Sequence, residues 1–501
     1  MKDLSQKNVL VLGLGASGLA LARWCVRCGA QVTVADTRRL PPNLNELRTD
    51  VPVANFVHAE MNEALLSTAS FDMVLKSPGL SPASIAGVIA AAQSRGIVCG
   101  NELSLFAQAL AELKNDRAYA PQVIGITGTN GKTTVTSLTG QLIQCAGKSV
   151  AVAGNIGPTL LDTLIQWLDE ESGDQPLPEV WVLELSSFQL DGVSNFHPTV
   201  ATVLNVTQDH LDWHESLTHY AAAKSSVYGN SSVMLLNRND ALVMAAMPPL
   251  IKGKPLRACL TFGHDEPKRP GDYGIETANG MAWLVRAAVA DETVKRRKDN
   301  DMALYIQRMM PIDALRIRGR HNATNALAAL GLAVAAGCSL APMLHGLREY
   351  RGEPHRVASI AVINGVEYFD DSKGTNVGAT VAALTGLGVE RKLVLILGGE
   401  GKGQDFSPLV EPASRYARAV VLIGRDAPLI RAALQDLSVP LLDAASMSEA
   451  VLSATQQAQT GDAVLLSPAC ASFDMFDDYK HRADVFFQAV QALAHEQGVV
   501  L

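Results

Sequence analysis

The chain has 501 residues, of which 48% are hydrophobic and 18% are charged. Its length exceeds what one hydrophobic core normally supports, so about three domains are expected. The formal net charge of −8 argues against nucleic acid or an anionic membrane surface as a partner. No apolar run reaches the ~18 residues of a membrane span, so we expect a cytoplasmic protein without membrane insertion. Seven scattered cysteines fit a reducing compartment, and Cys25 and Cys28 are interpreted as buried packing residues of a helix.

The first predicted domain covers residues 1–100 and begins like a dinucleotide-binding unit. The apolar run Asn8–Leu12 enters a glycine-rich turn at 13–18, and the next predicted strand ends at Asp36. In such a fingerprint the glycines permit a tight turn near a phosphate, and the acid lies near a ribose. A further predicted strand, Phe71–Leu75, runs into a second loop. The pattern predicts a Rossmann-like domain.

The second predicted domain, residues 101–353, carries a glycine-rich loop between an apolar strand and a helix, at 123–134. Its backbone N–H groups, the ammonium of Lys132 and the helix dipole converge on one point, and Thr133 offers a hydroxyl to magnesium. This predicts a nucleotide triphosphate site. The strict phosphate-loop spacing would place glycine at Ile126, so an ordinary glycine turn stays open.

The remaining elements predict an α/β protein with three domains in series. The central domain is expected to contain a parallel sheet of the phosphate-loop ATPase type, with a small antiparallel excursion at about 262–317. Strand–helix alternation starts again in the third domain, 354–501, which is expected to be Rossmann-like. Predicted strands in these two domains are Val180–Leu185, Val200–Asn205, Val233–Leu236, Ala361–Ile363, Lys392–Leu397, Ala419–Ile423 and Ala463–Leu466.

Charged residues follow several of these strands. Glu184 ends an apolar strand and is well placed to hold magnesium, although a strand-end acid facing solvent fits equally well. Asp209, His210 and Asp212 cluster after the next strand, and we favour His210 as a metal or phosphate ligand. By local composition Lys224 is an ordinary surface lysine on a helix.

Three loops of the third domain also follow apolar strands and combine small residues with one or two charges, which is typical of ligand-binding loops. They lie at 370–376, 398–402 and 467–473. Arg356, at the start of this domain, is a candidate to reach a nucleotide.

Taken together, these motifs resemble the Mur ligases of bacterial cell-wall synthesis over essentially the whole chain. The motifs that carry the resemblance are Thr-Gly-Thr-Asn-Gly-Lys-Thr (127–133), Glu-Leu-Ser-Ser-Phe-Gln-Leu (184–190), Asn-Val-x-x-Asp-His-Leu-Asp (205–212), His-Asn-x-x-Asn-Ala (321–326), Asp-Ser-Lys-x-Thr-Asn (371–376) and Leu-Ser-Pro-Ala-x-Ala-Ser (466–472). The first is the family's own version of the phosphate loop, which accounts for Ile126. The last two point to the member that adds D-glutamate, and the Asp-Asn-Pro-Arg motif of diamino-acid-adding members is absent from the sequence.

The resemblance implies an ATP-dependent ligase that joins D-glutamate to UDP-N-acetylmuramoyl-L-alanine through an acyl phosphate, releasing ADP and phosphate. It implies two Mg²⁺ sites, a carbamylated lysine and small-molecule partners, and we expect a monomer. By the resemblance the first domain holds the UDP-sugar, the central domain ATP, and the third domain the amino acid and part of the nucleotide.

The resemblance also assigns residues to each ligand. It implies ATP contacts from Gly128, Thr129, Asn130, Gly131, Lys132, Thr133, Thr134, Asn325, Arg356 and Asp371. It implies UDP-sugar contacts from Gly15, Ala16, Ser17, Asp36, Thr37, Arg38, Ser77, Pro78, Gly79 and Asn155, and D-glutamate contacts from Lys373, Thr375, Lys402, Ser472, Phe473 and Tyr479. The implied metal ligands are Thr133, Glu184, His210 and the carbamate of Lys224, and the implied catalytic residues are Lys132, His210 and Lys224.

Two residues depart from the family pattern, because Glu400 stands where aspartate is expected and Tyr479 where phenylalanine is expected. A charged stretch at 286–311 is longer than usual for the family. Two other functional classes remain at this point. An NAD-dependent oxidoreductase would use the fingerprint at 13–18 but would leave the phosphate loop without a task. A nucleotide switch would need a base-reading motif such as Asn-Lys-x-Asp, which is absent from the sequence.

Overall fold

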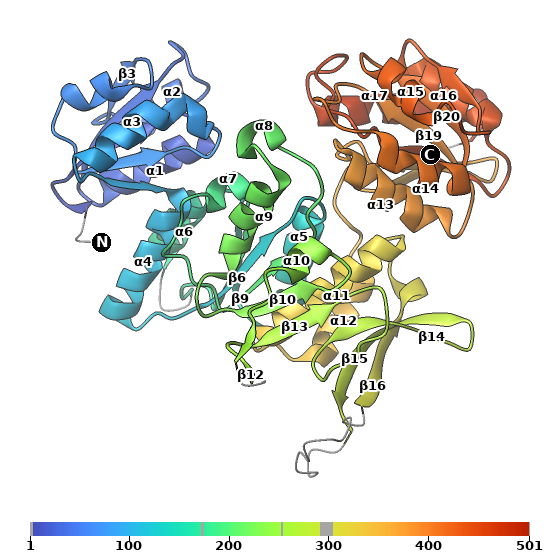
Figure 1. The fold of residues 1–501 in the computed structure, drawn as a ribbon, viewed down its shortest axis with the longest axis horizontal. Helices are drawn as coiled ribbons and strands as arrows, with labels where there is room; N and C mark the ends of the chain where they lie inside the picture. Colours follow the sequence, from blue (N-terminus) through green and yellow to red (C-terminus); the bar gives the residue numbers. More distant parts are fainter. Residues whose placement is uncertain (1–3, 172–174, 252–253, 291–303, 500–501) are drawn as a thin grey trace. The chain divides into compact units, whose positions relative to one another are not determined.

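The computed structural model describes residues 4–171, 175–251, 254–290 and 304–499. The chain divides into two compact units. The first unit comprises Met1–Val206, His210–Thr261 and Ala328–Met343, and the second comprises Thr207–Asp209, Phe262–Leu327 and Leu344–Leu501. Three α/β sheets follow one another along the chain, which confirms the predicted fold class (Figure 1). None of the helices in the described ranges is long and apolar enough to span a membrane.

The first sheet has the strand order β3-β2-β1-β4-β5, and all its strands are parallel. Its strands are β1 (Asn8–Leu12), β2 (Gln31–Asp36), β3 (Asn55–His58), β4 (Met73–Lys76) and β5 (Val98–Asn101). The helices that follow them are α1 (Ala16–Arg27), α2 (Leu44–Asp50), η2 (Glu63–Ser67), α3 (Pro82–Ser94) and α4 (Glu102–Arg117). The strand order reverses between β1 and β4, so the loops after these two strands face one crevice at the carboxyl edge of the sheet. Cys25 and Cys28 are buried, free thiols on or next to α1, which confirms their packing role.

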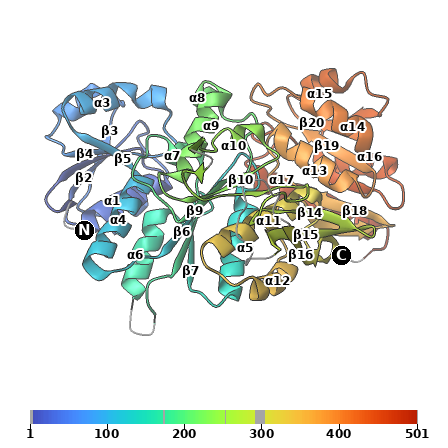
Figure 2. The ribbon, with the colours of Figure 1, turned by 60° about the horizontal axis from the view of Figure 1, so that its bottom comes forward.

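The second sheet has the order β13-β10-β9-β6-β8-β7, and its strands β10, β9, β6, β8 and β7 are parallel (Figure 2). Its strands are β6 (Gln122–Thr127), β7 (Val150–Gly154), β8 (Val180–Glu184), β9 (Val200–Val203), β10 (Val233–Asn237) and β13 (Cys259–Phe262). The intervening helices are α5 (Lys132–Cys145), α6 (Leu160–Glu170), α7 (Ser187–Leu190), α8 (Leu211–His214), α9 (Leu217–Ser225), η3 (Ser226–Tyr228) and α10 (Ala241–Met244). Every residue of β8 is buried, as expected for a central strand of a parallel sheet.

The predicted antiparallel excursion is a three-stranded sheet of order β14-β15-β16. Its strands are β14 (Tyr273–Ala278), β15 (Met281–Val289) and β16 (Leu304–Pro311), and a short pair, β11 (Leu250–Ile251) and β12 (Lys254–Pro255), precedes it. Within the charged stretch at 286–311, residues 291–303 lie outside the described residues. The helices that follow are η4 (Ile312–Ala314), α11 (Arg320–Ala335) and α12 (Leu340–Glu349).

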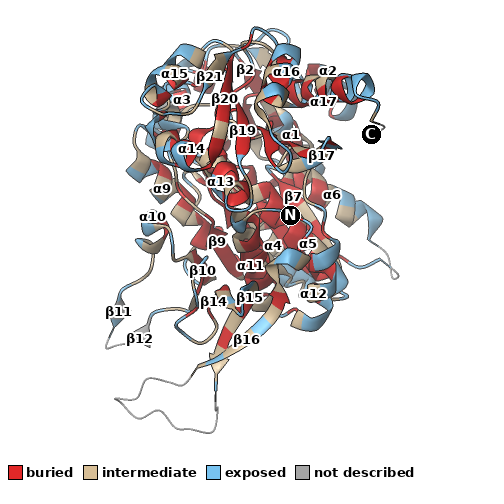
Figure 3. Ribbon diagram, turned by 90° about the vertical axis from the view of Figure 1, so that its right-hand side faces the viewer, coloured by how far each residue is buried: buried red, intermediate tan, exposed pale blue. Residues whose placement is uncertain are grey.

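The third sheet has the order β17-β18-β22-β19-β20-β21, with β17 antiparallel and the other strands parallel. Its strands are β17 (Ala358–Ile363), β18 (Val366–Asp370), β19 (Leu393–Gly398), β20 (Ala417–Ile423), β21 (Leu441–Asp443) and β22 (Ala463–Leu466). Alternate residues of β19 and β20 enter two separate apolar clusters, one on each face of the sheet. One cluster contains side chains of α13 (Val377–Gly388), α14 (Val410–Tyr416) and α15 (Ala427–Leu434), with η5 (Ser407–Leu409). The other contains those of α16 (Met447–Gln457) and α17 (Tyr479–Glu496). The strands β19 and β20 between these helices are coloured as mostly buried in Figure 3.

Candidate functional site

The glycine-rich loop between β6 and α5 has the geometry of an anion cradle. Gly131 caps α5 with a left-handed backbone at φ 84°, and Gly128 has φ 154°. A Cβ on Gly128 would lie 2.9 Å from the Cβ of Leu204, so only glycine fits there. The ammonium of Lys132 folds back and donates hydrogen bonds to the carbonyls of Gly128 (2.8 Å) and Thr129 (2.9 Å). These carbonyls hold the ammonium of Lys132 over the loop. A phosphate bound there would contact both this ammonium and the N-terminus of α5.

Asn205, near the start of the loop after β9, holds this cradle in place. Its side-chain oxygen accepts a hydrogen bond from the N–H of Asn130 (2.8 Å), and its side-chain amide donates to the carbonyl of Asn130 (3.0 Å). Its own carbonyl accepts a third bond, from the N–H of Thr129 (2.9 Å). The carboxamide therefore pairs with both backbone polar groups of one loop residue, Asn130, in the manner of a neighbouring strand. Asn205 belongs to a motif found in the sequence, but nothing in the sequence indicated this structural role.

Lys224 on α9 is buried, with only 1% of its surface exposed. Its ammonium donates to the carbonyl of Gly128 (3.0 Å) and lies 4.3 Å from the centre of the Tyr220 ring. Lys132 and Lys224 thus meet at one carbonyl oxygen of the phosphate loop. The interpretation from local composition, an exposed lysine, is wrong. The alanines before Lys224 do not reveal that this lysine is buried, because its burial results from the packing of α9 against α7 and α8.

Glu184, the last residue of β8, is also 1% exposed. One carboxylate oxygen, Oε1, accepts a hydrogen bond from the Asn155 side chain (2.8 Å), whereas the buried Oε2 has no hydrogen-bond partner in the part of the chain that the structure describes. An unpartnered buried carboxylate oxygen is costly, and a cation at this place would remove that cost. The donor set fits Mg²⁺, which takes one or two protein oxygens and completes its shell with phosphate and water. Among the described residues, no three His, Cys, Asp or Glu side chains come together to form a metal cluster.

Glu184→Gln is expected to weaken the binding of Mn²⁺, used as a spectroscopic substitute for Mg²⁺, on the order of tenfold or more, because it replaces a charged oxygen ligand by a neutral amide. Titration of the ATP-bound protein followed by electron paramagnetic resonance measures this affinity without requiring turnover. Glu170→Gln, at an exposed position on α6, is the matched control and should leave it unchanged. Equal Mn²⁺ affinity of both variants would remove Glu184 from the metal site.

The histidines near this loop occupy different environments. His210 is exposed at the start of α8, with a left-handed backbone (φ 53°), and its ring centre lies 4.8 Å from that of Phe188. His214, one turn later, is buried, and its Nε2 lies 2.9 Å from Ser187 Oγ. The role of His210 as a ligand stays a prediction. The side chain of Asp212, predicted to cluster with it, lies outside the described residues.

In the first domain the predicted UDP-sugar residues lie at the crevice between β1 and β4. Burial alone would raise the pKa of Asp36, but hydrogen bonds from Arg38 and from the N–H of Leu14 outweigh it and lower the pKa to about 2. Asp36 therefore stays ionised and holds the glycine turn. Ser77 Oγ donates to the carbonyl of Gly13 (3.0 Å), which ties the two loops together. The structure places the other predicted residues on these loops or at the start of α1, namely Gly15, Ala16, Ser17, Thr37, Pro78 and Gly79.

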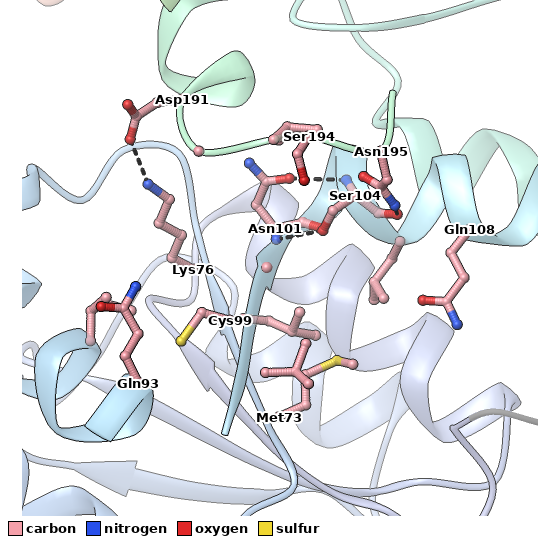
Figure 4. A pocket seen from close by; sticks show the side chains of 17 residues that line it. Met73, Lys76, Gln93, Cys99, Asn101, Ser104, Gln108, Asp191, Ser194 and Asn195 are labelled. Atoms are coloured by element: carbon pink, nitrogen blue, oxygen red, sulfur yellow. Dashed lines mark hydrogen bonds and ion pairs between the residues drawn. The ribbon is translucent and has the colours of Figure 1, made fainter. Parts of the chain in front are cut away.

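A cavity of about 420 Å³ lies beside these loops in the first unit (Figure 4). It opens among β4, β5, α3, α4 and the segment Asp191–Asn195, and Met73 and Cys99 line it. At its edge the ammonium of Lys76 pairs with the carboxylate of Asp191 at 2.7 Å. Lys76 directly precedes Ser77, so this ion pair ties the loop after β4 to the segment that follows α7.

The three polar loops of the third domain are joined to one another by hydrogen bonds. The N–H of Ala469 donates to the carbonyl of Gly374 (3.0 Å), and Ser467 Oγ donates to a carboxylate oxygen of Asp371 (2.6 Å). Glu400 and Ala471 exchange two backbone bonds of 2.9 Å each. The loops at 370–376, 398–402 and 467–473 therefore form one assembly at the carboxyl edge of the third sheet.

Electrostatics distinguish the two acids at the end of β18. Burial raises the pKa of Asp371 to about 7, although the Ser467 hydroxyl and the charge of Arg356 act in the opposite direction. Asp370 instead lies 2.7 Å from Nδ1 of His355 and accepts a bond from the N–H of Ser372 (2.9 Å). Arg356 and Asp371, both predicted nucleotide contacts, are thus electrostatically coupled within the second unit. Asn325, the third predicted contact there, lies on α11 and donates to the Asn322 side chain (3.1 Å).

The predicted D-glutamate residues come from this loop assembly and the start of α17. The ammonium of Lys373 lies 5.5 Å from the centre of the Tyr479 ring, and that of Lys402 lies 5.8 Å from the centre of the Phe473 ring. Ser472 is buried beside Phe473, and the N–H of Thr375 bonds to the carbonyl of Lys373. Two lysines held against aromatic rings provide positive charge for an anionic ligand. The two residues that depart from the family pattern also have partners in this loop assembly. The ring of Tyr479 faces the ammonium of Lys373, and Glu400 forms an ion pair with Arg425 (3.3 Å).

A phosphate loop with two lysines and a buried carboxylate on the neighbouring strand define a nucleotide-binding α/β enzyme. Comparisons with known proteins identify its class further. Three family models match the chain, described as Mur ligase MurD-like, N-terminal domain (residues 7–100), Mur ligase middle domain (126–333) and Mur ligase, glutamate ligase domain (355–470). The chain belongs to the Mur ligase family.

Curated relatives match the chain over its whole length. It is 64% identical to the UDP-N-acetylmuramoylalanine--D-glutamate ligase of Albidiferax ferrireducens, over 99% of this chain and 98% of that protein. It is 58% identical to the protein of the same name from a Polaromonas species, over 100% of both chains. Among solved structures, MurF ligase from Thermotoga maritima in complex with ADP matches with a TM-score of 0.56 and 15% identity, over 99% of this chain and 100% of that chain. UDP-N-acetylmuramate-alanine ligase MurC from the same organism matches with a TM-score of 0.54 and 20% identity, over 97% and 100%. At such identities the two structures show a shared fold only.

Proposed function

We propose that this chain joins D-glutamate to UDP-N-acetylmuramoyl-L-alanine in peptidoglycan precursor synthesis, converting ATP to ADP and phosphate. The full-length similarity to ligases of that name supports the substrates. The observation that carries the chemistry is the phosphate loop, where Lys132 and Lys224 meet at Gly128. The open carboxylate oxygen of Glu184, on the neighbouring strand β8, adds the cation ligand that ATP chemistry needs. We place the reaction in the cytoplasm and propose a monomer.

An amine does not displace an oxygen from a free carboxylate, because the oxide ion is a very poor leaving group. The reaction therefore requires ATP to activate the carboxylate. Transfer of the γ-phosphate to the carboxylate of the substrate's L-alanine gives an acyl phosphate. The amine of D-glutamate then attacks the acyl carbon, and the tetrahedral intermediate expels phosphate. The protein has to position the partners and to stabilise the charge of the transferring group.

Each domain has a proposed share in this reaction. We propose that residues 1–100 bind the UDP-sugar, residues 101–353 bind ATP, and residues 354–501 bind D-glutamate and part of the nucleotide. In the central domain the ammonium of Lys132 would stabilise charge on the γ-phosphate. Thr133 and Glu184 would hold Mg²⁺, which spreads the charge of the phosphoryl group when bound. His210 is the proposed residue near a second metal or the base for the incoming ammonium group.

Phosphate release is expected only when ATP, the UDP-sugar and D-glutamate are all present, with ADP as the nucleotide product, because the cradle presents the γ-phosphate. A coupled phosphate assay with a panel of D- and L-amino acids, followed by chromatography of the nucleotides, measures both points. AMP and pyrophosphate as products would contradict the acyl-phosphate route. A fluorescence change on adding NADH, without phosphate release on adding ATP and substrates, would instead favour an oxidoreductase.

A further inference from the structure

Arg482, on the first turn of α17, is the most deeply buried cation of the third domain's loop assembly, with 0% of its surface exposed. Its guanidinium spans two loops. Nε and Nη2 donate to the hydroxyl and the carbonyl of Ser372, at 2.9 and 2.7 Å. Nη1 donates to the carbonyl of Cys470 at 3.0 Å. The loop at 370–376 and the loop at 467–473 are thus bonded to opposite sides of one rigid, planar group.

Among the described residues, no carboxylate is hydrogen-bonded to Arg482. All its hydrogen-bond acceptors are neutral, and Asp370, Asp371 and Asp474 act on it only through longer-range attraction. Burial lowers the pKa of Arg482 to about 10, so the guanidinium still carries its charge at neutral pH. Burying a cation without a bonded anion costs free energy of folding. Apolar residues usually hold two loops together at a smaller cost in free energy. The directed fork of three bonds supplies what apolar packing does not, namely a defined spacing of the loops.

Four of the six residues proposed for D-glutamate lie on the two loops that Arg482 joins. Lys373 and Thr375 lie one and three positions after Ser372, and Ser472 and Phe473 lie two and three positions after Cys470. Ser372 Oγ also donates to the carbonyl of Tyr479 (2.8 Å), so the same cluster holds the aromatic residue beside Lys373. We propose that Arg482 is a positioning residue that sets the spacing of these loops and thereby the affinity for the amino-acid substrate. This inference rests on the proposed function.

Arg482→Lys tests this, because lysine keeps the charge and length but cannot make three directed bonds to two loops at once. We expect the KM for D-glutamate to rise on the order of tenfold, as for loss of one charge-assisted hydrogen bond. The KM values for ATP and the UDP-sugar should stay within about twofold, since their proposed residues lie mainly elsewhere. Arg418→Lys, which weakens the ion pair of Arg418 with Asp462 in the same domain, is the matched control and should leave all three KM values unchanged. The melting temperature of each variant reports its folding.

Ser372→Ala provides a second, milder variant in case Arg482→Lys does not fold. It removes the hydroxyl that accepts from Nε of Arg482 and donates to Tyr479, and it should also raise the KM for D-glutamate selectively. A double-mutant cycle of the two changes should be non-additive, because both act on one contact. Equal changes in all three KM values, or no change for D-glutamate in either variant, would overturn the proposal. If the wild-type enzyme uses another amino acid, the proposed function fails. The same comparison with that amino acid still tests whether Arg482 sets the spacing of the two loops.

Discussion

Lys132→Ala is expected to lower the rate of substrate-dependent phosphate release by at least ~100-fold, because it removes a preorganised charge from the transferring phosphoryl group. In the structure the ammonium is held by the carbonyls of Gly128 and Thr129, so it is positioned before the nucleotide arrives. A cation that is already oriented loses little free energy to reorganisation when charge develops in the transition state.

The effect should appear in kcat, measured at saturating ATP, more than in the KM of the UDP-sugar, whose proposed residues lie in the first domain. Lys114→Ala, at an exposed position on α4, is the matched control and should keep the wild-type rate. A loss of less than about tenfold for Lys132→Ala would mean that another group supplies the charge, and Lys224 at the same carbonyl would be the first to test.

Most of the fold follows from periodicity and glycine placement in the sequence. Continuous apolar runs identified central strands such as β1 and β22. A strand that is buried on both faces carries apolar residues at nearly every position, so it is easily recognised in the sequence. Strands without such runs were missed or were predicted without bounds. β7 (Val150–Gly154) consists of valine, alanine and glycine, and two of these residue types have low strand propensity. β18 (Val366–Asp370) carries a glutamate and ends in an acid, so its apolar run is short, and it was predicted only as the strand before the loop at 370–376, without bounds.

Candidate site residues could be predicted where they directly follow a predicted strand. They could not be predicted where their role depends on hydrogen bonds to residues far away in the sequence. Glu184 and the loop at 370–376 lie at carboxyl ends of parallel strands, where ligands bind in such sheets. The clamp of Asn205 on the phosphate loop joins residues 75 positions apart, and Arg482 reaches Ser372 over 110 positions. Sequence composition near Arg482 is that of an ordinary charged helix start, and its burial depends on tertiary packing alone.

Lys224 is expected to be carbamylated in the active enzyme, and Lys224→Ala is expected to lose most of the activity. Carbon dioxide adds to a neutral amine, which releases one proton, and the resulting carbamate keeps one N–H and carries one negative charge shared by its two oxygens. That N–H can keep the bond that Lys224 makes to the carbonyl of Gly128. The new oxygens would supply metal ligands in a place where the described residues form no cluster of three acidic, histidine or cysteine side chains. An ammonium in the same place would instead repel a divalent cation.

Lys224→Arg separates the carbamate from simple positive charge, because a guanidinium keeps the charge but does not form a carbamate. It should be as inactive as the alanine variant. Acetate, a small carboxylate, should partly restore Lys224→Ala by filling the vacated metal position and should leave the wild-type rate unchanged. Carbon-13 NMR of wild-type protein in labelled bicarbonate should show a carbamate signal that Lys224→Arg lacks. Near-normal activity of Lys224→Arg would refute carbamylation, and the buried ammonium would then act as a second fixed charge beside Lys132, with both lysines on the carbonyl of Gly128.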